Sequence, residues 1–283
     1  EGGLFAERGL EVEYVAAAAT ANAAEAVAAG DADFALTSAV HLLAAQTNAA
    51  GSLPVRFVAN FHQYNPIAGV VREDSGRRTP QDLGGARAAR WSIPWYAQEY
   101  AGALDRMGIA APVIVETPGG LDQAIGSGEV EVLPMWMDDT TPAVINGLIL
   151  HHAGESFGVR AIALPIPVYS TGLIAADRVP LEVVCLMREA LAAGHDLQRD
   201  RPAPGLAGFQ RWFPDVSEEH VRVNWSLYAP NAFDGGSPPG TMHAERWQDT
   251  IVHTARTHGV TALPGERVYR PELLATEDRR AVA

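Results

Sequence analysis

Two hydroxyl groups and an imidazole stand at one turn of the chain, in the stretch DFALTSAVH. An apolar, strand-like run ends at Thr37 and Ser38, and His41 follows on the first turn of a helix-like segment. These three side chains donate and accept hydrogen bonds, so they suit polar recognition of a small molecule. His41 could also transfer protons, and the alternative for a histidine at this position is packing inside the protein.

Side chains of similar kinds follow the other predicted strands. In an open sheet of parallel strands, ligands bind beyond the carboxyl ends of the strands. Aromatic rings there stack on planar ligands, and amides, hydroxyls and imidazoles orient them, although each ring taken alone could equally belong to the core. Besides Thr37, Ser38 and His41, the predicted ligand-binding residues are Asn60, Phe61, His62, Gln63, Trp91, Ser92, Trp95, Tyr96, Trp136, Asp138 and Tyr169. Together they predict a pocket for a planar, neutral or weakly cationic solute.

Asp138 and Asp139 allow three interpretations. They could act as general acid and base, pair with an amino group of a ligand, or cap the helix expected from Thr141. Adjacent residues on one element point to different sides, so we expect at most one of the two carboxylates to face the pocket.

The histidines do not predict a metal site. His151 and His152 are adjacent and point apart, and His253 and His258 are too far apart to share one helix face. The sequence contains neither the HExxH pattern of zinc peptidases nor the GxSxG turn of serine hydrolases. We therefore expect no metal ion and no nucleophilic catalysis of these kinds.

The charged residues exclude further classes of protein. All 21 basic residues are arginines, so neither a Walker A loop nor a lysine-bound pyridoxal phosphate is possible, and we expect no cofactor. The formal net charge of −13 disfavours nucleic acid as a partner. The single cysteine, Cys185, cannot form an internal disulfide, and its apolar surroundings indicate a small buried side chain.

Strand and helix patterns alternate along the 283 residues, which predicts an α/β fold of mixed, mostly parallel sheets. The patterns predict a strand over residues 12–15, a helix over 141–154 and a long helix over 180–194. No run of 18 apolar residues is present, so we expect no transmembrane helix.

Five segments occur in an order that resembles one protein family. They are GLFAERGLEVEYV, AVAAGDADFAL, GVVREDS followed by TPQDLGGAR, AIGSGEVEV, and VYSTGLIAADRV. In this order they resemble the type 2 periplasmic solute-binding fold. The relevant branch includes thiamine-precursor-binding proteins, thiamine pyrimidine synthases, and binding proteins for alkanesulfonates, nitrate and taurine.

The resemblance implies a two-lobed protein with a ligand cleft between the lobes. Lobe one would contain residues 1–74 and 169–283, and lobe two residues 75–168. The family also has a strand before the segment that begins this chain. The implied function is extracytoplasmic capture of a small heterocycle, such as a thiamine pyrimidine precursor, for an ABC importer. A monomer would then deliver its ligand to a membrane permease, either from the periplasm or as a cell-surface lipoprotein.

Two departures from the synthases favour binding over catalysis. The position of their cofactor-holding lysine is Thr37 here, while His41 matches a histidine that they consume as substrate. Their cysteine-rich cluster is replaced by PIPVYST. The resemblance therefore implies a binding protein rather than an enzyme. The alternatives are an enzyme of the same fold that uses His41, and a sensor module without a transporter.

Overall fold

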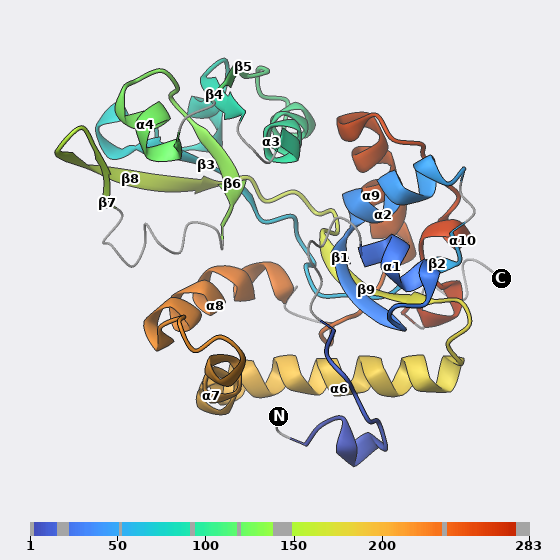
Figure 1. Ribbon diagram of the computed structural model, residues 1–283. Helices are drawn as coiled ribbons and strands as arrows, with labels where there is room; N and C mark the ends of the chain where they lie inside the picture. Colours follow the sequence, from blue (N-terminus) through green and yellow to red (C-terminus); the bar gives the residue numbers. More distant parts are fainter. Residues whose placement is uncertain are drawn as a thin grey trace. The chain divides into compact units, whose positions relative to one another are not determined.

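The computed structural model describes residues 3–15, 23–50, 53–90, 94–117, 120–137, 149–233 and 237–275 (Figure 1). The chain divides into two units. Unit 1 contains residues 1–64, 167–214 and 231–283, and unit 2 contains residues 65–166 and 215–230. The first passage between units falls at Tyr64 and Asn65, ten residues before the expected boundary at 74, because the strand that begins at Ile67 pairs within unit 2.

Unit 1 contains a sheet whose middle strand comes from late in the sequence. Its order is β1 (Phe34–Ser38), β9 (Thr171–Ala176) and β2 (Val55–Asn60), and both outer strands run antiparallel to β9. β1 and β2 are therefore parallel to each other, as expected for two strands joined by the crossover helix α2 (Ala39–Asn48). In this register Thr37 and Asn60 both lie opposite Gly172.

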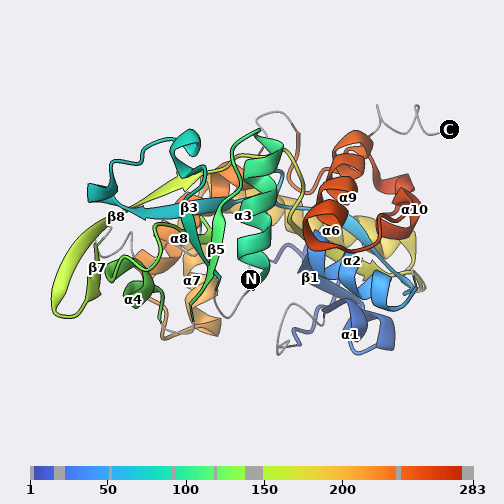
Figure 2. The same cartoon turned by 90° about the horizontal axis from the view of Figure 1, so that it is seen from above.

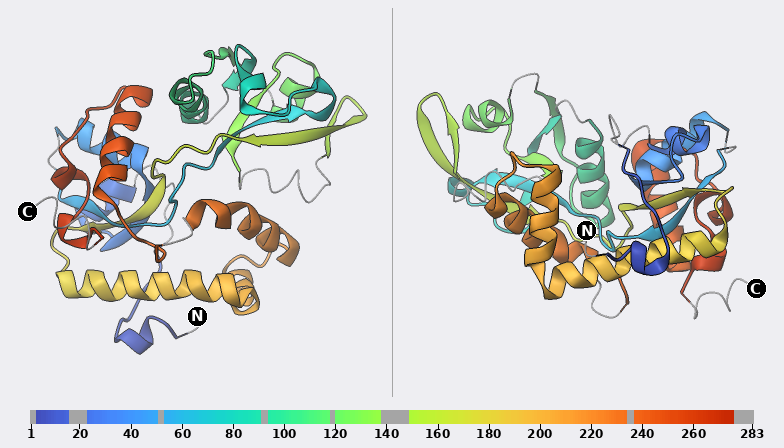
Figure 3. Two further views of the ribbon diagram at one scale, coloured as in Figure 1. Left: turned by 180° about the vertical axis from the view of Figure 1, so that it is seen from behind. Right: turned by 60° about the horizontal axis from the view of Figure 1, so that its bottom comes forward.

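Helices cover both faces of this sheet. α2 and α9 (Ala244–His258) lie on one face and α6 (Leu181–Asp200) lies along the other, as Figures 1 and 3 show. α9 ends at Gly259, whose φ of 67° is a left-handed value that glycine adopts without strain. The other helices of this unit are α1 (Ala23–Ala29), α7 (Pro202–Trp212) and α10 (Gly265–Val268).

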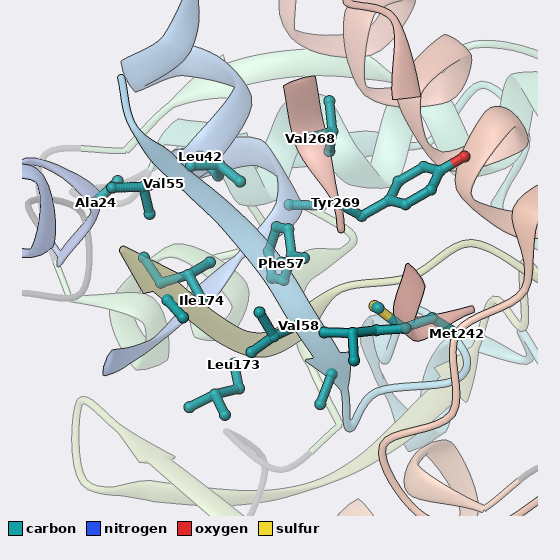
Figure 4. Packing of buried hydrophobic residues seen from close by; sticks show 14 of the residues in the cluster. Ala24, Leu42, Val55, Phe57, Val58, Leu173, Ile174, Met242, Val268 and Tyr269 are labelled. Atoms are coloured by element: carbon teal, nitrogen blue, oxygen red, sulfur yellow. The ribbon is translucent and has the colours of Figure 1, made fainter. Parts of the chain in front are cut away.

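Aromatic rings fill the core of unit 1 between the sheet and α9. The fully buried Trp247 of α9 contacts Phe57 of β2, with ring centroids 4.8 Å apart, and also contacts Tyr169 and Tyr269. Figure 4 shows apolar side chains from α1, α2, β2, β9 and the C-terminal segment converging around Phe57. Such buried rings contribute much of the hydrophobic stabilisation of a core.

Unit 2 contains a larger antiparallel sheet and a small parallel one. The first has the order β6 (Leu133–Trp136), β3 (Ile67–Arg72), β8 (Glu155–Ala163) and β7 (Ile149–His152). The second pairs β4 (Arg87–Arg90) with β5 (Val113–Glu116). β7 and β8 form a hairpin that turns at Ala153 and Gly154, which both have positive φ (Figure 3).

α3 (Pro94–Arg106) packs against β3, β4 and β6 (Figure 2). It approaches β3 closely at Gly69, where a Cβ atom would lie 3.1 Å from the ring of Tyr100. The other helices in the described part of the chain are α4 (Leu121–Gly126) and α8 (Glu218–Ala232), and short 3-10 turns occur there at Ala6–Arg8, Glu73–Ser75, Pro80–Leu83 and Pro271–Leu273.

The α/β class predicted from the sequence is confirmed, but the predicted pairing is not. Among the described strands only β4 and β5 pair in parallel, because β9 enters between β1 and β2 and runs against both. Residues 149–152 of the predicted helix 141–154 form β7, which gains hydrogen bonds from β8, and residues 141–148 lie outside the described part. Residues 12–15 are irregular rather than a strand, whereas the long helix is present as α6.

Within the described ranges, no helix has the length and apolar character needed to cross a bilayer.

Candidate functional site

The turn from β1 into α2 is closed by the residues singled out in the sequence. Ser38 caps α2, because its Oγ accepts a hydrogen bond from the backbone N–H of His41. The same Oγ lies 3.0 Å from Nδ1 of His41. Burial, and then the nearby His258, lower the pKa of His41, while Glu25 acts in the opposite direction. Thr37 and Ser38 are buried and His41 is half-buried, so this turn presents uncharged polar groups at neutral pH.

Asn60 and Gln63 hold the main chain where it leaves β2. The amide of Asn60 donates to the carbonyl of His62, and Nε2 of Gln63 donates to the carbonyls of Asn60 (2.8 Å) and Thr241 (3.0 Å). Oε1 of Gln63 accepts from the Arg246 guanidinium at 2.9 Å. Both predicted residues therefore use amide groups within unit 1, and a role in binding a ligand stays a prediction.

Phe61 and His62 lie beside a histidine that the sequence analysis did not select. The Phe61 ring stacks on His195 of α6, with ring centroids 4.5 Å apart and planes 3° from parallel. Burial and the neighbouring His195 lower the pKa of His62 to about 3, and burial lowers that of His195 to about 4. Both imidazoles are therefore neutral at pH 7.

Tyr169 belongs to the core of unit 1. Its ring packs against Trp247, its hydroxyl accepts from the backbone N–H of His243 at 2.7 Å, and its own N–H donates to Oγ1 of Thr250 at 2.9 Å. Arg246 lies over the ring, 5.5 Å from its centroid. These bonds make Tyr169 a structural link between α9 and the segment before β9.

The structure brings three predicted rings together in unit 2. Trp95 and Tyr96 begin α3, and Trp136 ends β6. The Trp95 and Trp136 rings meet edge to face with centroids 5.0 Å apart, and Tyr96 lies 4.1 Å from Trp95 and 5.9 Å from Trp136. Tyr96 is buried, whereas both tryptophans are half-buried. We call Trp95, Tyr96 and Trp136 the aromatic cluster.

Three predicted residues, Trp91, Ser92 and Asp138, lie outside the described residues, as does Asp139. Conversely, the sequence analysis missed Asn65, Glu99, Arg246 and Thr250, whose bonds join elements distant in the chain. No local pattern singles out such residues, because each one depends on a partner brought near only by folding.

An open hollow of about 470 Å³ lies on unit 1, lined by Pro167, Glu245, Arg246, Gln248 and Asp249. Its charges have both signs, and Arg246 is already bonded to Gln63 and placed over the rings of Tyr64 and Tyr169. Within the described ranges no group of three or more His, Cys, Asp or Glu side chains is placed to hold a metal ion.

The model of one protein family, described as NMT1/THI5 like, matches residues 1–202. The chain belongs to the NMT1/THI5-like family. A comparison with curated protein sequences gives no significant match.

Solved structures show that this family member has the fold of type 2 periplasmic binding proteins. The alkanesulfonate-binding protein SsuA from Xanthomonas axonopodis pv. citri, bound to MOPS, is 16% identical with a TM-score of 0.60, and the match covers 97% of this chain and 91% of that one. The periplasmic aliphatic sulphonate binding protein SsuA from Escherichia coli is 16% identical with a TM-score of 0.66, over 95% and 88%. A putative periplasmic sulfonate-binding protein from Methylobacillus flagellatus KT is 17% identical with a TM-score of 0.66, over 99% and 85%.

Proposed function

We propose that this protein is the extracytoplasmic solute-binding component of an ABC importer. Membership of the NMT1/THI5-like family and the fold shared with periplasmic binding proteins support this proposal. A monomer would bind its solute outside the cytoplasm and pass it to a membrane permease.

The proposed solute is a small planar heterocycle, such as a thiamine pyrimidine precursor. The observation that carries this choice is the aromatic cluster, in which two half-buried tryptophans meet edge to face. Each aromatic contact with a planar ring contributes about 0.5 to 1.5 kcal/mol beyond simple burial. The uncharged polar groups at Ser38 and His41 are compatible with a neutral solute.

A sulfonate is the second candidate, because the similar structures include alkanesulfonate-binding proteins. A sulfonate has only hydrogen-bond acceptors and carries a negative charge, so it needs cationic or N–H donors. Arg246 is a cation bonded to one predicted residue, Gln63, and placed over another, Tyr169. Glu245 and Asp249 line the same hollow, which disfavours an anion there.

We propose that the protein does not transform its solute. The synthases that it resembles use a lysine-bound cofactor, and this chain contains no lysine. The two alternatives, an enzyme using His41 and a sensor module, predict turnover or a signalling output in place of delivery to a permease.

Isothermal titration against a panel of solutes tests the proposal. The panel contains 4-amino-5-hydroxymethyl-2-methylpyrimidine, thiamine, riboflavin, methanesulfonate, MOPS and nitrate, and each mixture is afterwards analysed for products. Binding of the pyrimidine without turnover is expected. Preferential binding of a sulfonate would replace the proposed ligand, and turnover of any solute would reject the binding-only function.

Variants then assign the contacts of the solute that binds. Trp95→Ala and Trp136→Ala should each weaken the affinity for a planar solute by about twofold to tenfold, as loss of one aromatic contact predicts. Phe213→Ala removes an exposed ring of unit 1 and serves as the control. Ser38→Ala tests the polar residues of unit 1 separately.

A further inference from the structure

Asn65 stands at the first passage of the chain from unit 1 into unit 2, and its side chain is almost completely buried, with 6% of the residue exposed. Its backbone N–H donates to the carbonyl of Ile166, the last residue before the chain returns to unit 1. The first two of the four passages between the units therefore meet at Asn65 on the unit 2 side.

The side chain of Asn65 joins this passage to α3. Its Nδ2 donates to Oε1 of Glu99 at 2.5 Å, and its Oδ1 accepts from the backbone N–H of Ile67 at 3.1 Å. Glu99 is also buried, with 5% exposed. A hydrogen bond to a buried carboxylate is strong and directional, since few other groups can compensate for the loss of water.

Glu99 lies one helical turn after Trp95, so both side chains project from the same side of α3. The residues that follow Asn65 reach the other tryptophan of the aromatic cluster. Ile67 pairs with Trp136 across β3 and β6, and the N–H of Met137 donates to the carbonyl of Pro66 at 2.8 Å. Residues 65–67 therefore contact both α3, which carries Trp95, and β6, which carries Trp136.

We propose that Asn65 is a positioning residue that fixes the aromatic cluster relative to the first two segments that connect the units, at residues 64–67 and 166. A change in the backbone at residues 64–66 is transmitted through the Asn65–Glu99 bond to α3 and through β3 to Trp136. The bearing of this arrangement on solute affinity rests on the proposed function, whereas the positioning of the rings does not.

The test first breaks the hydrogen bond between Asn65 and Glu99 and then restores it with donor and acceptor exchanged. Asn65→Asp places two carboxyl groups in contact, and at a pH high enough to ionise both, their like charges should repel and displace α3. In the double variant Asn65→Asp/Glu99→Gln, the new amide donates to the new carboxylate, and that carboxylate still accepts from the N–H of Ile67. Glu99→Gln alone keeps an acceptor for Nδ2 of Asn65 and should have a small effect.

Fluorine NMR of 5-fluorotryptophan-labelled, ligand-free protein gives the readout. Asn65→Asp should shift or broaden the resonances of Trp95 and Trp136 and leave that of Trp247 unchanged, and the double variant should restore both. Ile125→Ala, which opens a cavity in the unit 2 core at α4, is the control that lowers stability without moving these resonances. Circular dichroism establishes that each variant is folded.

Unchanged Trp95 and Trp136 resonances in Asn65→Asp, or no restoration in the double variant, would overturn the proposal. For a solute bound by the wild type, Asn65→Asp should weaken affinity by about tenfold, equivalent to one lost hydrogen bond, and the double variant should recover it. If no solute in the panel binds, the proposed function fails while the fluorine result still decides the role of Asn65.

Discussion

At the scale of single residues, Gly172 shows how closely the central strand of unit 1 is packed. A Cβ atom at this position would lie 2.4 Å from the carbonyl oxygen of Ala59 and 2.8 Å from Oδ1 of Asn60. Since the nearest obstacle is backbone, it cannot be relieved by a change of rotamer. Only glycine allows β2 to approach β9 so closely here.

Gly172→Ala should therefore lower the free energy of unfolding by about 1 to 3 kcal/mol, the usual cost of overpacking. The matched control is Gly194→Ala in α6 of the same unit, where the nearest atom to a new Cβ is 3.7 Å away. That change should stabilise the protein by up to about 1 kcal/mol, because alanine favours a helix over glycine. Urea unfolding measures both, and equal effects of the two variants would contradict the packing argument.

His62 gives a prediction about pH. Its pKa is lowered from the ordinary value of 6.5 to about 3, so between these values the unfolded chain binds a proton that the folded protein excludes. The contribution of His62 to the free energy of unfolding should therefore be constant above pH 6.5. Below pH 6.5 the free energy of unfolding should fall by up to about 1.4 kcal/mol per pH unit. His195 acts in the same direction.

Urea unfolding between pH 7.5 and 4.5 measures this slope. His62→Gln should flatten the dependence, whereas His151→Gln, which changes an exposed histidine, should leave it as in the wild type. If His62→Gln leaves the slope unchanged, the protons that the chain binds on unfolding belong to other groups.

At the scale of elements, α9 holds the segment that returns to unit 1. The Thr250 hydroxyl accepts from the N–H of Tyr169 and donates to the carbonyl of Arg246 at 2.6 Å. Thr250→Val keeps the shape of the side chain but removes this acceptor in a buried place, which should cost about 1 to 3 kcal/mol. Thr250→Ser keeps the hydroxyl and should cost less, so thermal unfolding of the pair separates hydrogen bonding from packing. A larger loss for serine than for valine would show that the methyl group matters more.

The elements also show where reading the sequence succeeds and where it stops. β1 and α2 follow from an apolar run and a helical pattern that lie close together in the chain, so they could be predicted, whereas Ser38 was selected for ligand binding and the structure shows that it caps α2. The position of β9 between β1 and β2 depends on pairing with residues more distant in the chain, and β7 depends on β8 in place of its own helical pattern. Neither pairing can be predicted from the local propensities of the residues in the strand itself.

The candidate site divides in the same way. Trp95, Tyr96 and Trp136 were selected because rings at strand ends suit a ligand, and the structure places them in contact. Asn65 and Glu99 were missed because an asparagine and a glutamate 34 positions apart form no spacing pattern, and only the fold brings them within hydrogen-bond distance.

At the scale of the whole molecule, each unit has a hydrophobic core of its own. Leu42 belongs to the core of unit 1 and Ile125 to that of unit 2, and both are fully buried. Leu42→Ala and Ile125→Ala should each cost about 2 to 5 kcal/mol. Hydrogen exchange read by mass spectrometry should show protection lost mainly in the unit that carries the change. Equal loss throughout the chain in both variants would indicate that the two cores unfold as one.

Because β9 lies between β1 and β2, the sheet of unit 1 cannot form until late in the synthesis of the chain. When the ribosome has made β1 and β2, the strand that must lie between them is still unmade, and the whole of β3 to β8 is synthesised first. The early strands therefore have open edges, which are prone to aggregate, while the sheets of unit 2 can already form. A nascent chain stalled before Thr171 should accordingly depend on a chaperone, and one stalled after α9 has emerged should not.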